Sequence, residues 1–258
     1  MPATPSRPNA ENGNVLFMIL IAIVLIGALT AAISSGNNAE RSNIDDETLV
    51  LRASEAQRYA SELERAVNFI MQQGFSESDI RFAHPDADSE YGDLSADTDK
   101  RDQVFHREGG GAKYRAAPDG INDGSAWEFY AGTHIPGMGR DDRAELVAVL
   151  PHVTAAFCAK INDLNDQSGT MQDTGTTAAG GSNPGNCVNI GALGRFDDSQ
   201  QFYSTINTMN EASGSFEQDA NTSAARPAPQ GCVICSMDTN ATDGTNDEYH
   251  FYHVLMTR

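Results

Sequence analysis

The sequence predicts an α+β protein in which a long N-terminal transmembrane-plus-amphipathic helix precedes a small antiparallel-sheet head domain with long loops. Three observations lead to this fold class. An uncharged stretch runs from Val15 to Ile33, and a helical pattern of apolar residues runs from Leu49 to Ile70. The rest of the chain has short β-rich runs, separated by segments rich in glycine, serine, threonine and aspartate.

The stretch from Val15 to Ile33 is predicted to cross a membrane. As a helix it is about 28 Å long, which is close to the thickness of the hydrocarbon core of a bilayer. Arg7 precedes it, and the positive-inside rule then places the N-terminus in the cytoplasm. We therefore expect contact with membrane lipid through this stretch and a single-pass protein of the bacterial inner membrane, with a periplasmic or extracellular C-terminal domain. A cleaved signal peptide ending near Ala32-Ile33-Ser34 is the alternative.

Residues 39–74 are predicted to form an amphipathic helix. Gly36-Asn37-Asn38 is expected to break or bend the helix at the end of the transmembrane part, residues 14–38, and Gly74 is expected to end the amphipathic helix. Intervals of four and three place the apolar residues on one face. The residues of this apolar stripe are Leu49, Ala53, Ala56, Ala60, Leu63, Val67 and Ile70. The stripe packs either on the protein's own head or against a second copy in a coiled coil.

The order of these N-terminal parts resembles that of type IV pilins and pseudopilins. A leader of residues 1–13 ends in Gly13, an apolar helix follows, and an amphipathic continuation leads into the head. The resemblance implies cleavage by a prepilin peptidase between Gly13 and Asn14. It also implies packing of the apolar helix against other pilin-like subunits or copies of the protein, in an envelope assembly such as type II secretion. The family's glutamate, five residues into the mature chain, is absent, because Met18 stands there.

The head, residues 75–258, is predicted to be an acidic, exported α+β domain. Strands are expected from Trp127 to Tyr130 and from Ala144 to Leu150, and a helix is expected from Pro151 to Leu164. Residues 165–186 are expected to be a flexible loop, because few of them have apolar side chains to bury.

The C-terminal region is predicted to be a β-hairpin. The β-rich runs from Gly231 to Met237 and from Glu248 to Met256 flank ten residues that are typical of turns. Both faces of the second run carry apolar or aromatic side chains, so we expect it to lie inside the sheet. Earlier in the head, Gly109-Gly110-Gly111 lacks the Lys-Ser/Thr ending of a phosphate-binding loop, and we interpret it as a turn.

Four cysteines, Cys158, Cys187, Cys232 and Cys235, are the clearest chemical feature of the head. An even number in an exported domain favours structural disulfides. Three pairings are open, and the spacing does not choose among them. Cys232 and Cys235 also form a CxxC pair, but redox pairs of this kind lie at a helix N-terminus, whereas this one is in a predicted strand.

Composition and motifs argue against several classes of function. The chain has 36 acidic and 17 basic residues, a net charge of −19, which disfavours nucleic acid as a partner. His250 and His253 are expected on opposite faces of one strand, and the other histidines are scattered through the head. No nucleophile-elbow, zinc-protease or Walker motif occurs. We therefore predict no catalytic residues and a protein that is not an enzyme.

A calcium site in the hairpin turn is a further hypothesis, and no other cofactor is expected. Asp238, Asn240, Asp243 and Asp247 supply the oxygen ligands that calcium prefers. Asp243 stands where an EF-hand loop requires glycine, so the turn is not an EF-hand. Solvated turn residues are the alternative.

The function expected from these features is structural, as a pilin-like or pseudopilin-like assembly subunit. Two alternatives remain open. One is an adaptor or sensor domain whose apolar stripe pairs two copies, and the other is an anchored thiol enzyme that uses Cys232 and Cys235.

Overall fold

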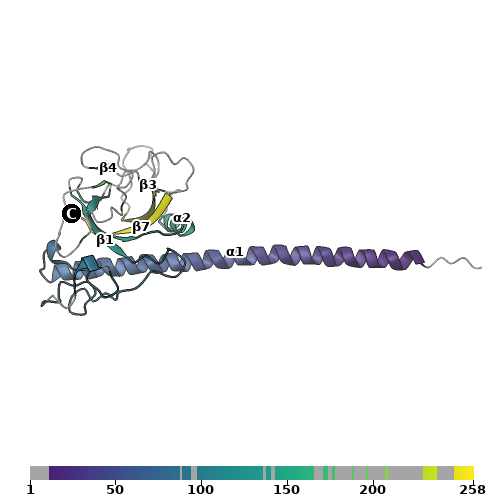
Figure 1. Cartoon of the computed structure of the whole chain (residues 1–258), viewed down its shortest axis with the longest axis horizontal. Coiled ribbons are helices and arrows are strands. Elements are labelled where there is room, and N and C mark those ends of the chain that lie inside the picture. Colours follow the sequence, from purple (N-terminus) through teal and green to yellow (C-terminus); the bar gives the residue numbers. More distant parts are fainter. Residues whose placement is uncertain are drawn as a thin grey trace, which may run out of the picture. The chain divides into compact units, whose positions relative to one another are not determined.

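The computed structural model is shown in Figure 1. The residues that the structure describes are 12–87, 89–93, 98–135, 138–140, 143–165, 171–173, 176–177, 188, 196, 207–208, 229–236 and 247–258. Their side chains are described except at 12–18, 24–45, 171–173, 176–177, 207–208, 235–236 and 247. The chain divides into two compact units, Met1–Thr48 and Leu49–Arg258.

The first helix, α1, runs over Asn12–Gln72 and contradicts the predicted membrane span. No helix in the described part of the chain is both long enough and apolar enough to cross a membrane. The described side chains of α1 from Asp46 to Gln72 include eight acidic or basic groups, and such groups are costly in hydrocarbon. The predicted transmembrane-plus-amphipathic fold class, the single-pass topology and the inner-membrane localisation are therefore wrong.

The backbone of α1 is helical through Gly36-Asn37-Asn38, so the helix is not broken there. The predicted end of the helix is confirmed. Gly74 has a φ of +93°, and its amide donates to the carbonyl of Met71 over 3.1 Å. This left-handed conformation suits glycine, because a Cβ would be strained there.

The apolar stripe of α1 is buried against the protein's own head. Leu63, Val67 and Ile70 are fully buried, and the three alanines of the stripe are at most 1% exposed. Leu49 packs on the same core. The first of the two interpretations of this stripe is thus confirmed, and a second copy has no access to it while the head remains in place.

One sheet forms the centre of the head, in the order β3-β6-β7-β2-β1-β5-β4. Its four central strands are antiparallel, whereas β3 and β5 pair in parallel with β6 and β1. The edge strands β3 and β4 fall inside the predicted loop of residues 165–186. The strands are β1 Glu128–His134, β2 Glu145–Leu150, β3 Met171–Asp173, β4 Thr176–Thr177, β5 Asn207–Thr208, β6 Gln230–Ser236 and β7 Asp247–Met256.

The C-terminal hairpin and the central place of its second strand are confirmed. Cys232 of β6 lies opposite Phe251 of β7, and β7 pairs on its other side with β2. Phe251 and Leu255 belong to the core that includes the stripe of α1, while Tyr252 and Val254 belong to a second core on the opposite face. Period-two alternation explains this division, because successive side chains of a strand point to opposite faces.

The second helix, α2 Ala155–Leu164, starts later than predicted. His152 has a φ of +53°, which is incompatible with a right-handed helix, so the helix cannot begin at Pro151. Thr154 caps the helix instead, and its hydroxyl accepts from the amide of Phe157 over 3.3 Å. Two short 3-10 helices, η1 Glu77–Asp79 and η2 Ser89–Tyr91, lie in the segment between α1 and β1.

The triplet Gly109-Gly110-Gly111 forms a tight turn that packs on α1, as expected for a structural role. The amide of Gly110 donates to the carbonyl of Gln103 over 2.9 Å. A Cβ on Gly110 would lie 2.8 Å from the Cβ of Ala66 and 2.7 Å from the carbonyl oxygen of Val104. Glycine is therefore required at this position by close packing of the turn on the helix.

We expect Gly110→Ala to destabilise the head by about 1 to 3 kcal/mol, because the added methyl group has no space. Urea unfolding, followed by the fluorescence of the single Trp127, measures this change. Gly124→Ala is the control with open space, since nothing lies within 4 Å of a Cβ there. Gly124 has a φ of +97°, so an alanine there still strains the backbone, and the loss of stability in Gly124→Ala reports this strain alone. Equal losses in both variants would contradict the packing argument.

Candidate functional site

The disulfide links α2 to the sheet. Cys158 of α2 is bonded to Cys232 of β6, with a Cα–Cα distance of 5.2 Å, and both residues are fully buried. The Asn162 side chain reinforces this link. Its amide nitrogen donates to the Cys232 carbonyl and its oxygen accepts from the Cys232 amide, each over 2.9 Å. One helix is thus joined to one strand by a covalent bond and two hydrogen bonds.

This pairing answers the question that the spacing left open. Cys232 is bonded to Cys158 and not to its CxxC neighbour Cys235. Cys235 lies on the backbone of β6, but its side chain is outside the described residues, as is the whole of Cys187. Within one chain, Cys187 and Cys235 are left only with each other as partners.

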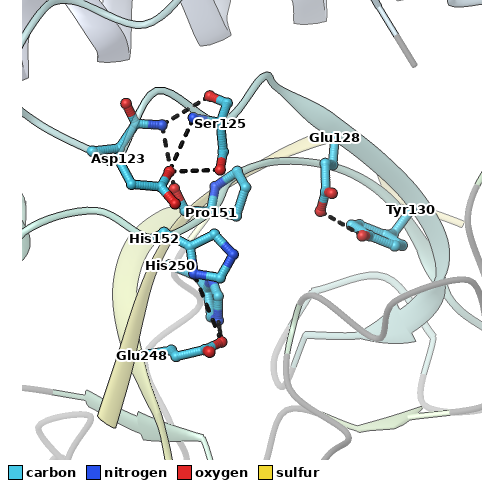
Figure 2. A network of polar contacts seen from close by, with 9 residues as sticks. Asp123, Ser125, Glu128, Tyr130, Pro151, His152, Glu248 and His250 are labelled. Carbon is cyan, nitrogen blue, oxygen red and sulfur yellow. Dashed lines mark hydrogen bonds and ion pairs between the residues drawn. The ribbon is translucent and has the colours of Figure 1, made fainter. Parts of the chain in front are cut away.

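A polar network surrounds the backbone turn at Pro151 and His152 (Figure 2). The imidazole rings of His152 and His250 lie 5.6 Å apart. One oxygen of Glu248 is 3.8 Å from Nδ1 of His152 and 3.6 Å from Nε2 of His250. These separations are too long for hydrogen bonds, so the contacts are electrostatic.

His250 is almost entirely buried within this network. Its Nδ1 has no hydrogen-bond partner among the described residues. Burial and, to a smaller extent, the neighbouring His152 together lower the pKa of His250 to about 4. The imidazole is therefore neutral at physiological pH, in spite of the carboxylate nearby.

Two short hydrogen bonds hold the adjacent segments in Figure 2. Asp123 accepts from the amide and the hydroxyl of Ser125 over 2.9 and 2.5 Å, which lowers the pKa of the Asp123 carboxyl. The hydroxyl of Tyr130 donates to Glu128 over 2.5 Å. Because the Ser125 hydroxyl is bound to a carboxylate and not to a histidine, it is not arranged as an activated nucleophile.

A second buried pair lies where β1 and β2 meet. Nδ1 of His134 is 3.3 Å from one oxygen of Glu145, and the amide of Ile135 donates to the other over 2.7 Å. Glu145 is fully buried, and burial raises its pKa. Strand periodicity could not identify the His134–Glu145 pair, because this pairing depends on the irregular register between Tyr130 and Thr133.

His253 is also buried, on the face of β7 opposite to that of His250. Its Nε2 lies 2.9 Å from a Glu64 oxygen on α1. The two β7 histidines therefore take different partners, as the spacing predicted. His152 was expected to be isolated, yet the fold brings it to His250 across about 100 residues of sequence.

An open pocket with a volume of about 270 Å³ lies in the described part of the head. It lies between α1 and the end of β7, and its lining includes Glu64, Asn68, Val254 and Met256. Glu64 is its only ionisable lining residue. The described residues that line the pocket include no general acid paired with a nucleophile, so the pocket does not suggest catalysis.

The remaining predicted site residues fall mostly outside the described side chains. Gly13 and Asn14 lie in the first turn of α1, and cleavage between them stays a prediction. Asp238, Asn240 and Asp243 are outside the described residues, while Asp247 begins β7. Among the side chains that are described, no group of three or more His, Cys, Asp and Glu residues is arranged to hold a metal ion.

Within the uncharged stretch of α1, the described side chains are those of residues 19–23, and the large apolar ones among them are exposed. Ile19 and Leu20 are each 56% exposed, and Ile23 is 64% exposed. Ile19 and Ile23 are four positions apart and share one face of the helix, whereas Leu20 lies about 100° around the helix from Ile19.

Comparisons with known proteins give no relative. No family model, no curated protein and no solved structure matches this chain.

Proposed function

We propose that the protein is a structural subunit that assembles with copies of itself through the uncharged part of α1, on the helix-plus-head plan of pilin-like subunits. The exposed apolar side chains of Ile19, Leu20 and Ile23 carry this proposal. A helix that is apolar on all sides is normally covered by other apolar surface. A membrane anchor and a role in secretion are not part of the proposal.

A second copy of the same helix is the partner that best fits this surface. The stretch from Val15 to Ile33 has no charged residue, so its partner needs no complementary charge. Gly27, Ala28 and Ala31 are small and allow helices to approach closely. A self-complementary surface of this kind buries the same residues on both partners.

The contacts of the head with α1 also support assembly through the uncharged part of the helix and not through its apolar stripe. Its core uses the apolar stripe of α1, so a coiled coil through Leu49 to Ile70 would require the head to detach. The adaptor alternative loses its pairing surface for this reason. Cys232 is bonded to Cys158 in the core, which leaves the thiol-enzyme alternative without its CxxC pair.

Sedimentation velocity of the full chain tests the proposal. We expect concentration-dependent assemblies much larger than the 27.6 kDa monomer, seen as regular particles by negative-stain electron microscopy. The net charge of −19 makes the heads repel one another, so assembly should increase between about 50 and 300 mM salt. Wild-type protein that stays monomeric under all these conditions would contradict the proposal.

The variant Ile19→Glu/Ile23→Glu places two charges on the proposed contact and should reduce the assemblies to monomers. Leu51→Glu is the matched control, because Leu51 is on the same helix and is 69% exposed, but lies outside the uncharged stretch. It should assemble as the wild type does. Loss of assembly in the control alone would place the contact elsewhere on α1.

A further inference from the structure

A ring of side-chain hydrogen bonds begins and ends on α1. Gln57 of α1 donates to Oδ1 of Asn165, which follows α2, over 3.0 Å. Gln230 of β6 donates to the same oxygen over 3.0 Å, and its own Oε1 is 3.2 Å from Nδ1 of His253 on β7. Nε2 of His253 is 2.9 Å from Glu64, two turns along α1 from Gln57. Four elements of the head are thus joined through one connected set of polar groups.

Most of the ring is partly exposed to solvent: Gln57, Asn165 and Gln230 are of intermediate exposure, and His253 is its buried member. His253 is 4% exposed, whereas the side chain of Glu64 is 42% exposed. Residues opposite His253 in β2 and β6 are Ala148 and Gln230, and neither ionises. Glu64 is therefore the ionisable group that acts on His253 among the described residues.

The orientation of the amides determines how many protons the ring holds. Gln230 donates with its nitrogen to Asn165, so its oxygen faces Nδ1 of His253. An oxygen only accepts, and Nδ1 must therefore carry hydrogen. Nε2 then lies 2.9 Å from a carboxylate oxygen and must share a second proton with Glu64. In this orientation the His253–Glu64 pair holds one proton more than a neutral imidazole beside a carboxylate.

Turning the amides of Gln57, Asn165 and Gln230 end for end gives a second complete ring. Gln230 then donates to Nδ1 of His253, and Nε2 donates to the Glu64 carboxylate without an additional proton. Asn165 has one polar atom without a partner in either ring, which is Nδ2 in the orientation described here. The hydrogen-bond count is the same in both, so the proton on His253 decides which ring forms.

We propose that this ring is a proton-controlled clamp between α1 and the head, in which protonation of the His253–Glu64 pair reverses the direction of the three hydrogen bonds that run from His253 through Gln230 and Asn165 to Gln57. At neutral pH the ring has the orientation in which Gln230 donates to Nδ1 of His253. On acidification Nδ1 gains a proton, and the ring takes the orientation in which Nδ1 donates to Gln230. Burial lowers the pKa of His253 and Glu64 raises it, so the reversal falls below pH 6.5. The clamp lies wholly within the second unit and does not depend on whether copies assemble.

Solid-state NMR of the full chain, labelled with 15N in histidine, asparagine and glutamine, tests the clamp whether or not the protein assembles. At pH 7.5 we expect one protonated nitrogen on His253, at Nε2, and we expect a second to appear as the pH is lowered below 6.5. The side-chain amide signals of Gln230 and Asn165 should shift with the same midpoint. A His253 that titrates while both amides stay unchanged would overturn the clamp, as would a His253 with two protons throughout.

Two variants separate the clamp from a local ion pair. Gln230→Met keeps the shape but removes the amide, so His253 should still titrate while the Asn165 amide no longer responds to pH. Glu64→Gln should lower the His253 midpoint by about 0.5 to 1 pH unit, because the opposite charge is partly exposed. An Asn165 response that persists in Gln230→Met would overturn the ring. The Trp127 fluorescence of each variant reports whether its core is intact.

Discussion

Replacing both members of the Cys158–Cys232 disulfide with alanine is expected to lower the free energy of unfolding by about 4 kcal/mol. The two residues are separated by 74 positions, and opening a loop of this length raises the entropy of the unfolded chain by about this amount. The bond also holds α2 on β6, where the Asn162 hydrogen bonds depend on the same alignment. Urea unfolding, followed by Trp127, should therefore show a clear loss of stability.

The control for this prediction is a non-reducing peptide map of the wild type. It should contain a fragment in which the Cys158 and Cys232 peptides are joined, and reduction should separate them. Free energies rather than midpoints must be compared, since removal of a cross-link changes the compactness of the unfolded state. A double-alanine variant as stable as the oxidised wild type would contradict the structural role of the bond.

The second large effect is a loss of stability on acidification that depends on His250. The pKa of His250 is about 4 in the folded protein and about 6.5 when unfolded, so the unfolded state binds the proton first as the pH falls. The contribution of His250 is fully present above pH 6.5 and is lost as the pH falls towards 4. The whole loss is about 3 kcal/mol, of which about 2 kcal/mol appears between pH 7.5 and pH 5.

Urea unfolding of wild type and His250→Leu at pH 7.5 and pH 5 measures the contribution of His250 to the free energy of unfolding. Both pH values lie above the isoelectric point near 4.5. We expect the variant to lose about 2 kcal/mol less than the wild type between these two pH values. His106→Leu changes a histidine outside the buried network and should keep the wild-type slope. Identical slopes in wild type and His250→Leu would show that His250 is not held neutral.

The spacing of apolar residues in the sequence correctly predicted the parts of the head in which burial follows the periodicity of a single helix or strand. The stripe from Ala53 to Ile70 and the last strand from Glu248 to Met256 are examples, because each side chain's direction follows from its position in the helix or strand. The start of α2 was misplaced, since no residue preference reveals the positive φ of His152.

The candidate sites depend on long-range contacts and were predicted less well. The pairing of Cys158 with Cys232 depends on α2 lying over β6, and the meeting of His152 with His250 depends on β7 lying beside the turn before α2. Neither contact has a signal in spacing alone. The hydrogen-bond ring from Gln57 to Glu64 is of the same kind, because its members come from four elements.

By itself, the sequence determined the periodic elements: a helix with one buried stripe, and a C-terminal hairpin whose last strand is covered on both faces. It also identified an uncharged helical stretch, but the environment of that stretch was inferred wrongly from its length and hydropathy. Only the tertiary structure decided the disulfide partner, the neutral state of His250 and the partners of His253. The physical reason is that periodicity is set by neighbours in the chain, whereas bonding and pKa values are set by neighbours in space.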